Sequence, residues 1–174
     1  MRMTLRDKKT LLIVLLIAVV AIIGIVTTIV ICNSKKKEGH MKKSIENYIK
    51  DSAMLTPEEV VLNHFKFRNE RNIDLLRLTL AENQRKVIID VKNIKRVEIN
   101  SIENITGDET KLKSGGEIKE NFNAYEVEYF DVEYEISYKK VTYQSSGVYL
   151  WRFAVARESK DAKWLICSWW DPRV

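Results

Sequence analysis

An uninterrupted apolar run between Leu11 and Cys32 constrains this chain more than any other feature of its sequence. The run holds 22 residues, and none of them is charged. About 20 apolar residues, each rising about 1.5 Å along a helix, cover the ~30 Å hydrocarbon core of a bilayer. The remainder of the 174-residue chain is too small to bury such a segment on every side. The run therefore predicts a single transmembrane helix at residues 11–32.

A basic tail at residues 1–10 precedes this span and resembles the start of a secretion signal. A cleaved signal has a shorter apolar segment and a small-x-small cleavage site, for which the exit of this run offers at best Cys32 and Ser34. A lipoprotein signal also ends in cysteine, but it needs a small residue directly before it, and here Ile31 precedes Cys32. We expect the segment to be retained as an anchor.

The orientation of the span depends on the basic residues at its two ends. The lysines at 35–43 compete with the basic tail under the positive-inside rule. A very short tail ahead of a first span usually behaves as a signal anchor, which favours the tail inside and the domain outside. The predicted location is the cell membrane, with a single pass and an extracytoplasmic domain.

The positive charge of the chain is confined to the region beside the predicted span. Residues 1–54 carry a net charge of +6, whereas residues 55–174 carry −1. Lysines close to anionic lipid headgroups contribute about 1 kcal/mol each to membrane attachment. The lipid bilayer is therefore the partner expected of residues 11–32 and their flanking lysines. Nucleic acid is excluded as a partner, because a nucleic-acid-binding domain is usually basic.

The first part after the span reads as a charged stalk at residues 33–54, in which Gly39 is expected to interrupt any helix continuing from the membrane. A short helix with a weak apolar stripe around Ile45 is possible in this stalk, but a solvated spacer fits the composition better. The folded domain is expected at residues 55–174.

Helices are predicted first in this domain. Thr56 is an N-cap, Pro57 occupies the first helical position, and Glu59 completes a capping box. The polar residues at 69–72 end this helix, and Asn72 or Asp74 can cap a shorter second one that extends to Leu80.

Strands follow from about residue 94, because the apolar period changes from helical to alternating. A slip or bulge is expected near Ser101. In the longest strand, Ala124 to Lys140, the apolar residues change parity at Tyr129-Phe130, which predicts a β-bulge and a curved strand. The acidic residues of this strand are expected on the opposite, solvated face: Glu126, Glu128, Asp131, Glu133 and Glu135.

Two more strands, at 148–157 and 164–170, complete a meander of about four antiparallel strands. One face of the first of these is expected to hold Tyr149, Trp151, Phe153 and Val155. Two or three helices followed by a curved antiparallel sheet predict the α+β class.

Three stretches carry a resemblance to a known family: PEEVVLNHFKFRNERN at 57–72, SSGVYLWRFAVARES at 145–159 and AKWLICSWWD at 162–171. They are similar to an uncharacterised bacterial family, domain of unknown function 4829. The order of elements resembles the nuclear-transport-factor-2-like, or cystatin-like, cone fold. Members of the family typically sit behind an N-terminal span or a lipoprotein signal, as this chain is expected to do. A family without an assigned activity implies no catalytic residues.

The chain offers little of the chemistry that metals, cofactors or nucleophilic catalysis need. The domain has one histidine, His64, and one cysteine, Cys167, and no Gly-rich phosphate loop or spaced metal ligands. No metal, no cofactor and no disulfide between Cys32 and Cys167 is expected. Enzymes of the cone fold work with an inward carboxylate and a tyrosine or histidine, so the ligand-pocket candidates are His64, Tyr125, Tyr134 and Trp151.

These patterns favour a membrane-anchored, extracytoplasmic binding or assembly module without catalytic activity. Its partner would be a protein or a small ligand. Two alternatives stay open: a structural component of a conjugation or secretion apparatus, and a cone-fold enzyme acting on a small hydrophobic substrate.

Overall fold

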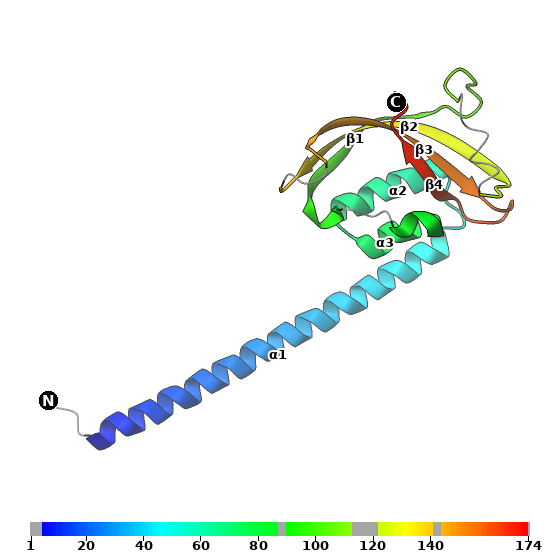
Figure 1. Cartoon of the computed structure of the whole chain (residues 1–174). Helices are drawn as coiled ribbons and strands as arrows, with labels where there is room; N and C mark the ends of the chain where they lie inside the picture. The colour runs from blue at the N-terminus through cyan, green and yellow to red at the C-terminus, as the bar shows by residue number, and fades with distance from the viewer. Residues whose placement is uncertain (1–4, 87–89, 113–121, 141–143, 174) are drawn as a thin grey trace. The chain divides into compact units, whose positions relative to one another are not determined.

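The computed structural model of the chain describes residues 5–86, 90–112, 122–140 and 144–173. For residues 5–21 and Gly24 it describes the backbone alone. The chain divides into two compact units, Met1–Ser44 and Ile45–Val174. The described residues form three α-helices, two short 3-10 helices and one four-stranded antiparallel sheet, which confirms the predicted α+β class (Figure 1).

Helix α1 (Leu5–Asp51) runs without a break through Gly39. The predicted interruption at this glycine is therefore wrong. A glycine inside a helix costs only about 1 kcal/mol relative to alanine, and a helix of 47 residues has many other backbone hydrogen bonds to sustain it. No atom lies within 4 Å of the position that a Cβ on Gly39 would occupy, so packing does not require the glycine either.

The predicted membrane span at residues 11–32 coincides with part of α1. The side chains of residues 11–21 and of Gly24 lie outside the described residues. Among the residues that the structure does describe, no helix is both long enough and apolar enough to cross a membrane.

The second compact unit begins at Ile45, ahead of the predicted domain start at residue 55. Ile45 and Tyr48 pack against the buried cluster around Phe67, and the rings of Tyr48 and Phe67 meet edge-on at 5.2 Å. Burial of the Tyr48 side chain in this contact raises its pKa to about 12. The last turns of α1 thus belong to the hydrophobic core of the domain.

Helix α2 (Pro57–Glu70) begins as the sequence predicts. The Glu59 amide donates to the Thr56 hydroxyl at 3.2 Å, and the Thr56 amide donates to the Glu59 carboxylate at 2.7 Å, which completes the capping box. The helix ends at Arg71, whose φ of 58° is left-handed. Such a residue commonly terminates a helix, although glycine is more frequent there.

Two polar residues at the end of α2 fix the first strand. The Arg71 guanidinium donates to the carbonyls of Ile94 and Lys95 at 2.6 and 2.7 Å, and the Asn69 side chain accepts the Val97 amide at 3.1 Å. Asn72, one of the two predicted caps, begins α3 (Ile73–Leu78) by accepting the Leu75 amide. The short 3-10 helices η1 (Glu82–Lys86) and η2 (Val91–Asn93) follow.

The sheet contains β1 (Ile94–Asn104), β2 (Glu126–Tyr138), β3 (Gly147–Arg157) and β4 (Leu165–Trp170), paired in chain order. Figure 1 shows α2 across the concave side of this curved sheet, with α3 on the far side of α2. A parallel bridge between Leu80 and Ile166 adds the segment after α3 to the edge of β4.

One predicted bulge is confirmed and the other is wrong. The pairing of β1 with β2 shifts between Ile99 and Ser101, close to the predicted slip at Ser101. No shift interrupts the pairing of β2 with β3, so the bulge predicted at Tyr129-Phe130 does not exist. The sheet bends without an inserted residue at this point.

The parity change that suggested the second bulge has a different cause, because β2 is buried on both faces where it passes Tyr129 and Phe130. Phe130 faces α2 in the main core, whereas Tyr129 lies on the opposite side in a second cluster with Ala154 and Cys167. Glu126 and Glu128 therefore share the parity of Phe130. The predicted single acidic face is wrong for these two residues and holds for Asp131, Glu133 and Glu135.

The core beneath α2 provides a test of these faces. Phe153 is 1% exposed, whereas Val148 on the same strand is 57% exposed. Truncation of a buried phenylalanine to alanine costs about 3–5 kcal/mol, so Phe153→Ala should lower the free energy of unfolding by that amount. Val148→Ala should change it by less than ~0.5 kcal/mol. Urea titration of the full chain in neutral detergent, followed by tryptophan fluorescence, measures both. Equal losses would contradict the face assignment.

Candidate ligand-binding site

The concave side of the sheet is lined by aromatic side chains. Helix α2 places Phe65 and His64 against the sheet, one residue apart on its buried face. The Phe65 ring lies 4.8 Å from that of Tyr134 and 5.5 Å from that of Phe153, measured between centroids. Aromatic pairs at these distances and inclined angles are favourable beyond the area that they bury.

His64 is a buried neutral residue of this core. The Thr79 hydroxyl donates to the Leu76 carbonyl at 2.7 Å, so its oxygen accepts a hydrogen bond from His64 Nδ1, 3.1 Å away. Burial, helped by the positive charge of Arg68, holds the pKa of His64 well below its usual value. The imidazole thus stays uncharged at neutral pH and is fixed by its hydrogen bond.

Arg68 lies one turn after His64, near the end of α2, and is half-buried. Its guanidinium carbon is 5.8 Å from the ring centroids of both Phe65 and Tyr134, within the range of cation–π contacts. Among the described residues, no carboxylate forms an ion pair with it. Its positive charge is therefore stabilised by aromatic faces rather than by an acidic side chain.

Tyr134 lies beneath Arg68 and is completely buried. Its hydroxyl oxygen makes no hydrogen bond within the described part of the chain. Burial raises the pKa of Tyr134, and Arg68 and Gln144 are near enough to oppose that rise. Most buried polar atoms in proteins are hydrogen-bonded, so this hydroxyl is unusual.

Two other tyrosines surround Tyr134, and their hydroxyls are engaged. Tyr138 donates to the Gln144 side-chain oxygen, and Tyr149 donates to the Ser145 carbonyl, each at 2.7 Å. The Tyr149 ring stacks on that of Tyr134, with centroids 5.9 Å apart. We call the group Arg68, Tyr134, Tyr138, Gln144 and Tyr149 the Arg68 cluster.

Three of the four predicted pocket residues share the concave side. Tyr134 and His64 both contact Phe65, and Trp151 stacks on Trp169, which also approaches His64. Tyr125 does not join them: it is 57% exposed, and the guanidinium carbon of Arg157 lies 5.9 Å from its ring. These side chains pack against one another as a core.

Sequence reasoning missed Arg68, although a usable signal was present. Arg68 follows His64 by four residues, a spacing that places both on one face of a helix. A basic residue on the buried face of a helix is uncommon, so this spacing could have indicated a functional group.

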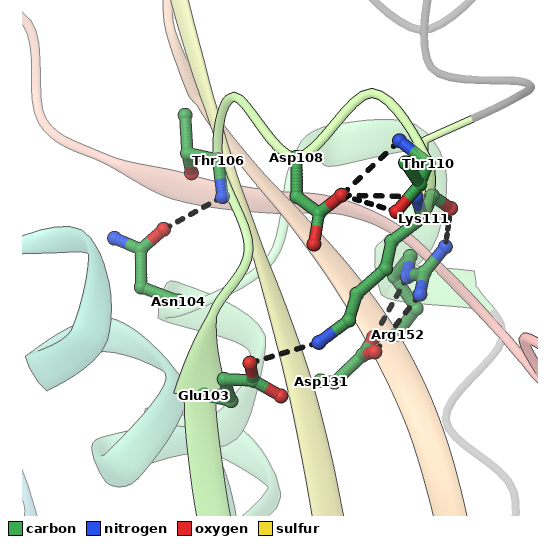
Figure 2. A network of polar contacts seen from close by, with 8 residues as sticks. All are labelled: Glu103, Asn104, Thr106, Asp108, Thr110, Lys111, Asp131 and Arg152. Atoms are coloured by element: carbon green, nitrogen blue, oxygen red, sulfur yellow. Dashed lines mark hydrogen bonds and ion pairs between the residues drawn. The ribbon is translucent and has the colours of Figure 1, made fainter.

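The outer side of the sheet carries a polar network instead (Figure 2). Arg152 donates twice to the Asp131 carboxylate, at 2.7 and 2.8 Å, and also to the Lys111 carbonyl. Lys111 in turn contacts Glu103 at 2.8 Å, and Asp108 accepts from Thr110 and caps the turn. Both cations of the network, Arg152 and Lys111, are paired with a carboxylate, and the network holds the segment after β1 against β2 and β3.

Neither thiols nor acidic clusters supply a reactive centre in the described residues. Cys167 is free and buried, and burial raises its pKa to about 12, far from a reactive thiolate. No group of three or more His, Cys, Asp or Glu side chains is arranged to hold a metal among these residues. A groove of about 90 Å³ on the outer face is lined by Arg96, Glu98, Glu135 and Ser137, and its arginine pairs with Glu98.

The comparisons with known proteins identify one family. The profile of a family described as a domain of unknown function (DUF4829) matches residues 58–169, more than half of the chain. No curated protein and no solved structure matches the chain.

The lowered pKa of His64 predicts how stability depends on pH. The unfolded chain protonates this histidine near pH 6.5, whereas the folded chain resists protonation until the pH is much lower. Below about pH 6.5 the unfolded state therefore binds one more proton, and stability falls by about 1.4 kcal/mol per pH unit from this group. His64→Gln should make the pH dependence of unfolding shallower in urea titrations between pH 7 and 5. His40→Gln, at an exposed position of α1, is the matched control and should leave the slope unchanged.

The Asp131–Arg152 pair predicts that substitutions at two nearby acidic residues of β2 differ in how much stability they remove. Its side chains are 13% and 8% exposed, so loss of the carboxylate leaves Arg152 in a poorly solvated place without its counter-charge. Fully buried pairs cost about 3–5 kcal/mol when one partner is removed, and we expect about 2–3 kcal/mol for Asp131→Asn. Glu133→Gln, on the same face but exposed, should cost less than ~0.5 kcal/mol. Chemical unfolding of both variants compares them, and a larger loss from Glu133→Gln would refute the structural role of the pair.

Proposed function

Because the chain belongs to the DUF4829 family, which brings no assigned activity with it, we propose a function from its own residues: a binding module held at a membrane by α1. In this proposal the domain lies outside the cytoplasm, and its ligand or partner meets the concave side of the sheet. The module binds and does not catalyse.

The proposal of a membrane anchor is supported by exposed apolar side chains on α1. Seven large apolar residues between 22 and 31 are each more than half exposed: Ile22, Ile23, Ile25, Val26, Ile29, Val30 and Ile31. Burial of such a side chain is worth about 1.5–3 kcal/mol, so a row of them exposed to water is costly. A hydrocarbon environment would remove that cost. The exposed lysines at 35–43 follow at the position expected of a headgroup contact.

The chemistry of the domain supports binding over catalysis. His64 is neutral and held by Thr79, and Asp131 is paired with Arg152. These groups have structural partners that a general acid or base would have to give up. The net charge of −1 on residues 55–174 also favours a partner other than nucleic acid.

The cone fold belongs to the same proposal. A curved antiparallel sheet that wraps one capped helix is the arrangement that the cone family would have, and α2 against β1–β4 supports it. In that architecture the concave side of the sheet is where a ligand is expected to bind.

Membrane retention is the experiment that tests the anchor. The full chain should remain in the membrane pellet after an alkaline carbonate wash, and its domain should be cut by protease added outside intact spheroplasts. The double change Ile25→Lys with Ile29→Lys should release most of the chain into the supernatant. Ile49→Lys alters an isoleucine of the same helix that is equally exposed, 53%, but outside the apolar row, and should leave the chain in the pellet. Release of the unaltered chain by carbonate would end the proposal.

A further inference from the structure

We propose that the Arg68 cluster binds the carboxylate of a small ligand whose body is aromatic or apolar. The inference rests on the proposed binding function and names its ligand class. Two observations on the described part of the chain carry it: an arginine without a carboxylate partner there, and a fully buried tyrosine hydroxyl without a hydrogen bond there.

The first observation is that Arg68 has no carboxylate partner among the described residues. A guanidinium presents five N–H donors in a planar fork that matches the two oxygens of a carboxylate. Of the other described arginines that are at least half-buried, Arg152 and Arg157 have the acidic partners Asp131 and Glu126, and Arg85 donates to the Leu80 carbonyl. Arg68 lies over the rings of Phe65 and Tyr134 and also near the Tyr134 hydroxyl. It therefore retains donors for an anionic oxygen supplied from outside the chain.

The second observation concerns the Tyr134 hydroxyl. A buried hydroxyl without a partner costs free energy, and phenylalanine would fill the same space without that cost. The stacked ring of Tyr149 and the neighbouring Arg68 surround this hydroxyl, so a ligand oxygen bound by Arg68 also comes within its reach. The tyrosine is thus suited to donate to a bound anion.

The remaining polar atoms of the Arg68 cluster indicate the charge of the ligand. Tyr138 and Tyr149 already donate to Gln144 and Ser145, which uses the side-chain oxygen of Gln144 as an acceptor. The Gln144 side chain also lies near the Tyr134 hydroxyl, and its amide group can donate as well as accept. A cluster whose available groups are donors recognises an acceptor, and with Arg68 among them that acceptor is best negatively charged.

Size favours a carboxylate over a phosphate. Tyr134 is completely buried, so a planar carboxylate disturbs the packing around its hydroxyl less than a tetrahedral phosphate would. The surrounding rings of Phe65, Tyr138 and Tyr149 suit an apolar body.

Calorimetric titration of the full chain in neutral detergent micelles tests the inference, with sodium benzoate as the probe. Benzoate should bind saturably, and the neutral isostere benzamide should not. Inorganic phosphate at matched ionic strength should bind at least tenfold more weakly than benzoate. Benzamide binding as strong as that of benzoate, or phosphate binding as strong, would overturn the carboxylate assignment.

Benzoate binding by substituted chains tests whether Tyr134 and Arg68 contact the ligand. Tyr134→Phe should weaken benzoate binding about tenfold, because it removes one hydrogen bond to a charged group. Arg68→Gln should weaken it further, and Arg68→Lys should fall between that variant and the unaltered chain, because lysine keeps the charge and loses the fork. Tyr125→Phe, at an exposed tyrosine outside the cluster, is the matched control and should bind benzoate normally.

Thermal unfolding of the ligand-free chain supplies a second, independent readout. Tyr134→Phe should leave the midpoint unchanged or raise it, since the hydroxyl has no hydrogen-bond partner among the described residues. A lower midpoint for Tyr134→Phe, together with no benzoate binding to the unaltered chain, would show that a bound water satisfies the hydroxyl, and would overturn the inference. Membrane retention is measured separately, so failure of the ligand site and failure of the anchor give different results.

Discussion

The contact between the buried face of α2 and the concave side of the sheet is the interaction on which the domain depends. Phe65 contacts residues of two strands, Tyr134 on β2 and Phe153 on β3. The Thr56 capping box sets where the helix begins, and Arg71 sets where it ends and where β1 starts. Because both ends are fixed, the side chains between them reach the sheet at defined heights. The position of Arg68 over Tyr134 follows from this arrangement.

Much of the fold could be predicted from the sequence, because its signals are local. The capping box at Thr56, the cap at Asn72 and the shift near Ser101 depend on residues a few positions apart, and the structure contains all three. The interruption at Gly39 failed because a single glycine is a weak helix breaker in a long helix. The membrane span at residues 11–32 stays a prediction.

The false bulge at Tyr129-Phe130 has a different origin. A strand with one buried face and a parity change needs an inserted residue, and that inference from the pattern is sound when only one face is covered. Here the segment after β1 covers the second face, so Tyr129 and Phe130 are both buried on a regular strand. The sequence of one strand does not tell how many of its faces the rest of the chain covers.

The candidate site could be predicted only in part for the same reason. His64, Tyr134 and Trp151 could be predicted to share the concave side, because aromatic and titratable residues on apolar faces stand out in a sequence. The exposure of Tyr125 depends on where β2 begins, at Glu126, and that boundary could not be read from the alternation alone. That the Tyr134 hydroxyl has no hydrogen bond within the described residues depends on its surroundings in three dimensions, which no local pattern contains.

The Asp131–Arg152 pair has a consequence for how the hairpin of β2 and β3 avoids misassembly during folding. Sliding one strand by a single residue would exchange its two faces. Near Tyr129 and Phe130 such an error would be poorly discriminated, since apolar residues occupy both sides. One residue further on, the same error would force a carboxylate or a guanidinium among the rings beneath α2, away from its counter-charge. A charged pair on the outer face therefore acts as a check on strand alignment at the place where hydrophobicity alone discriminates least.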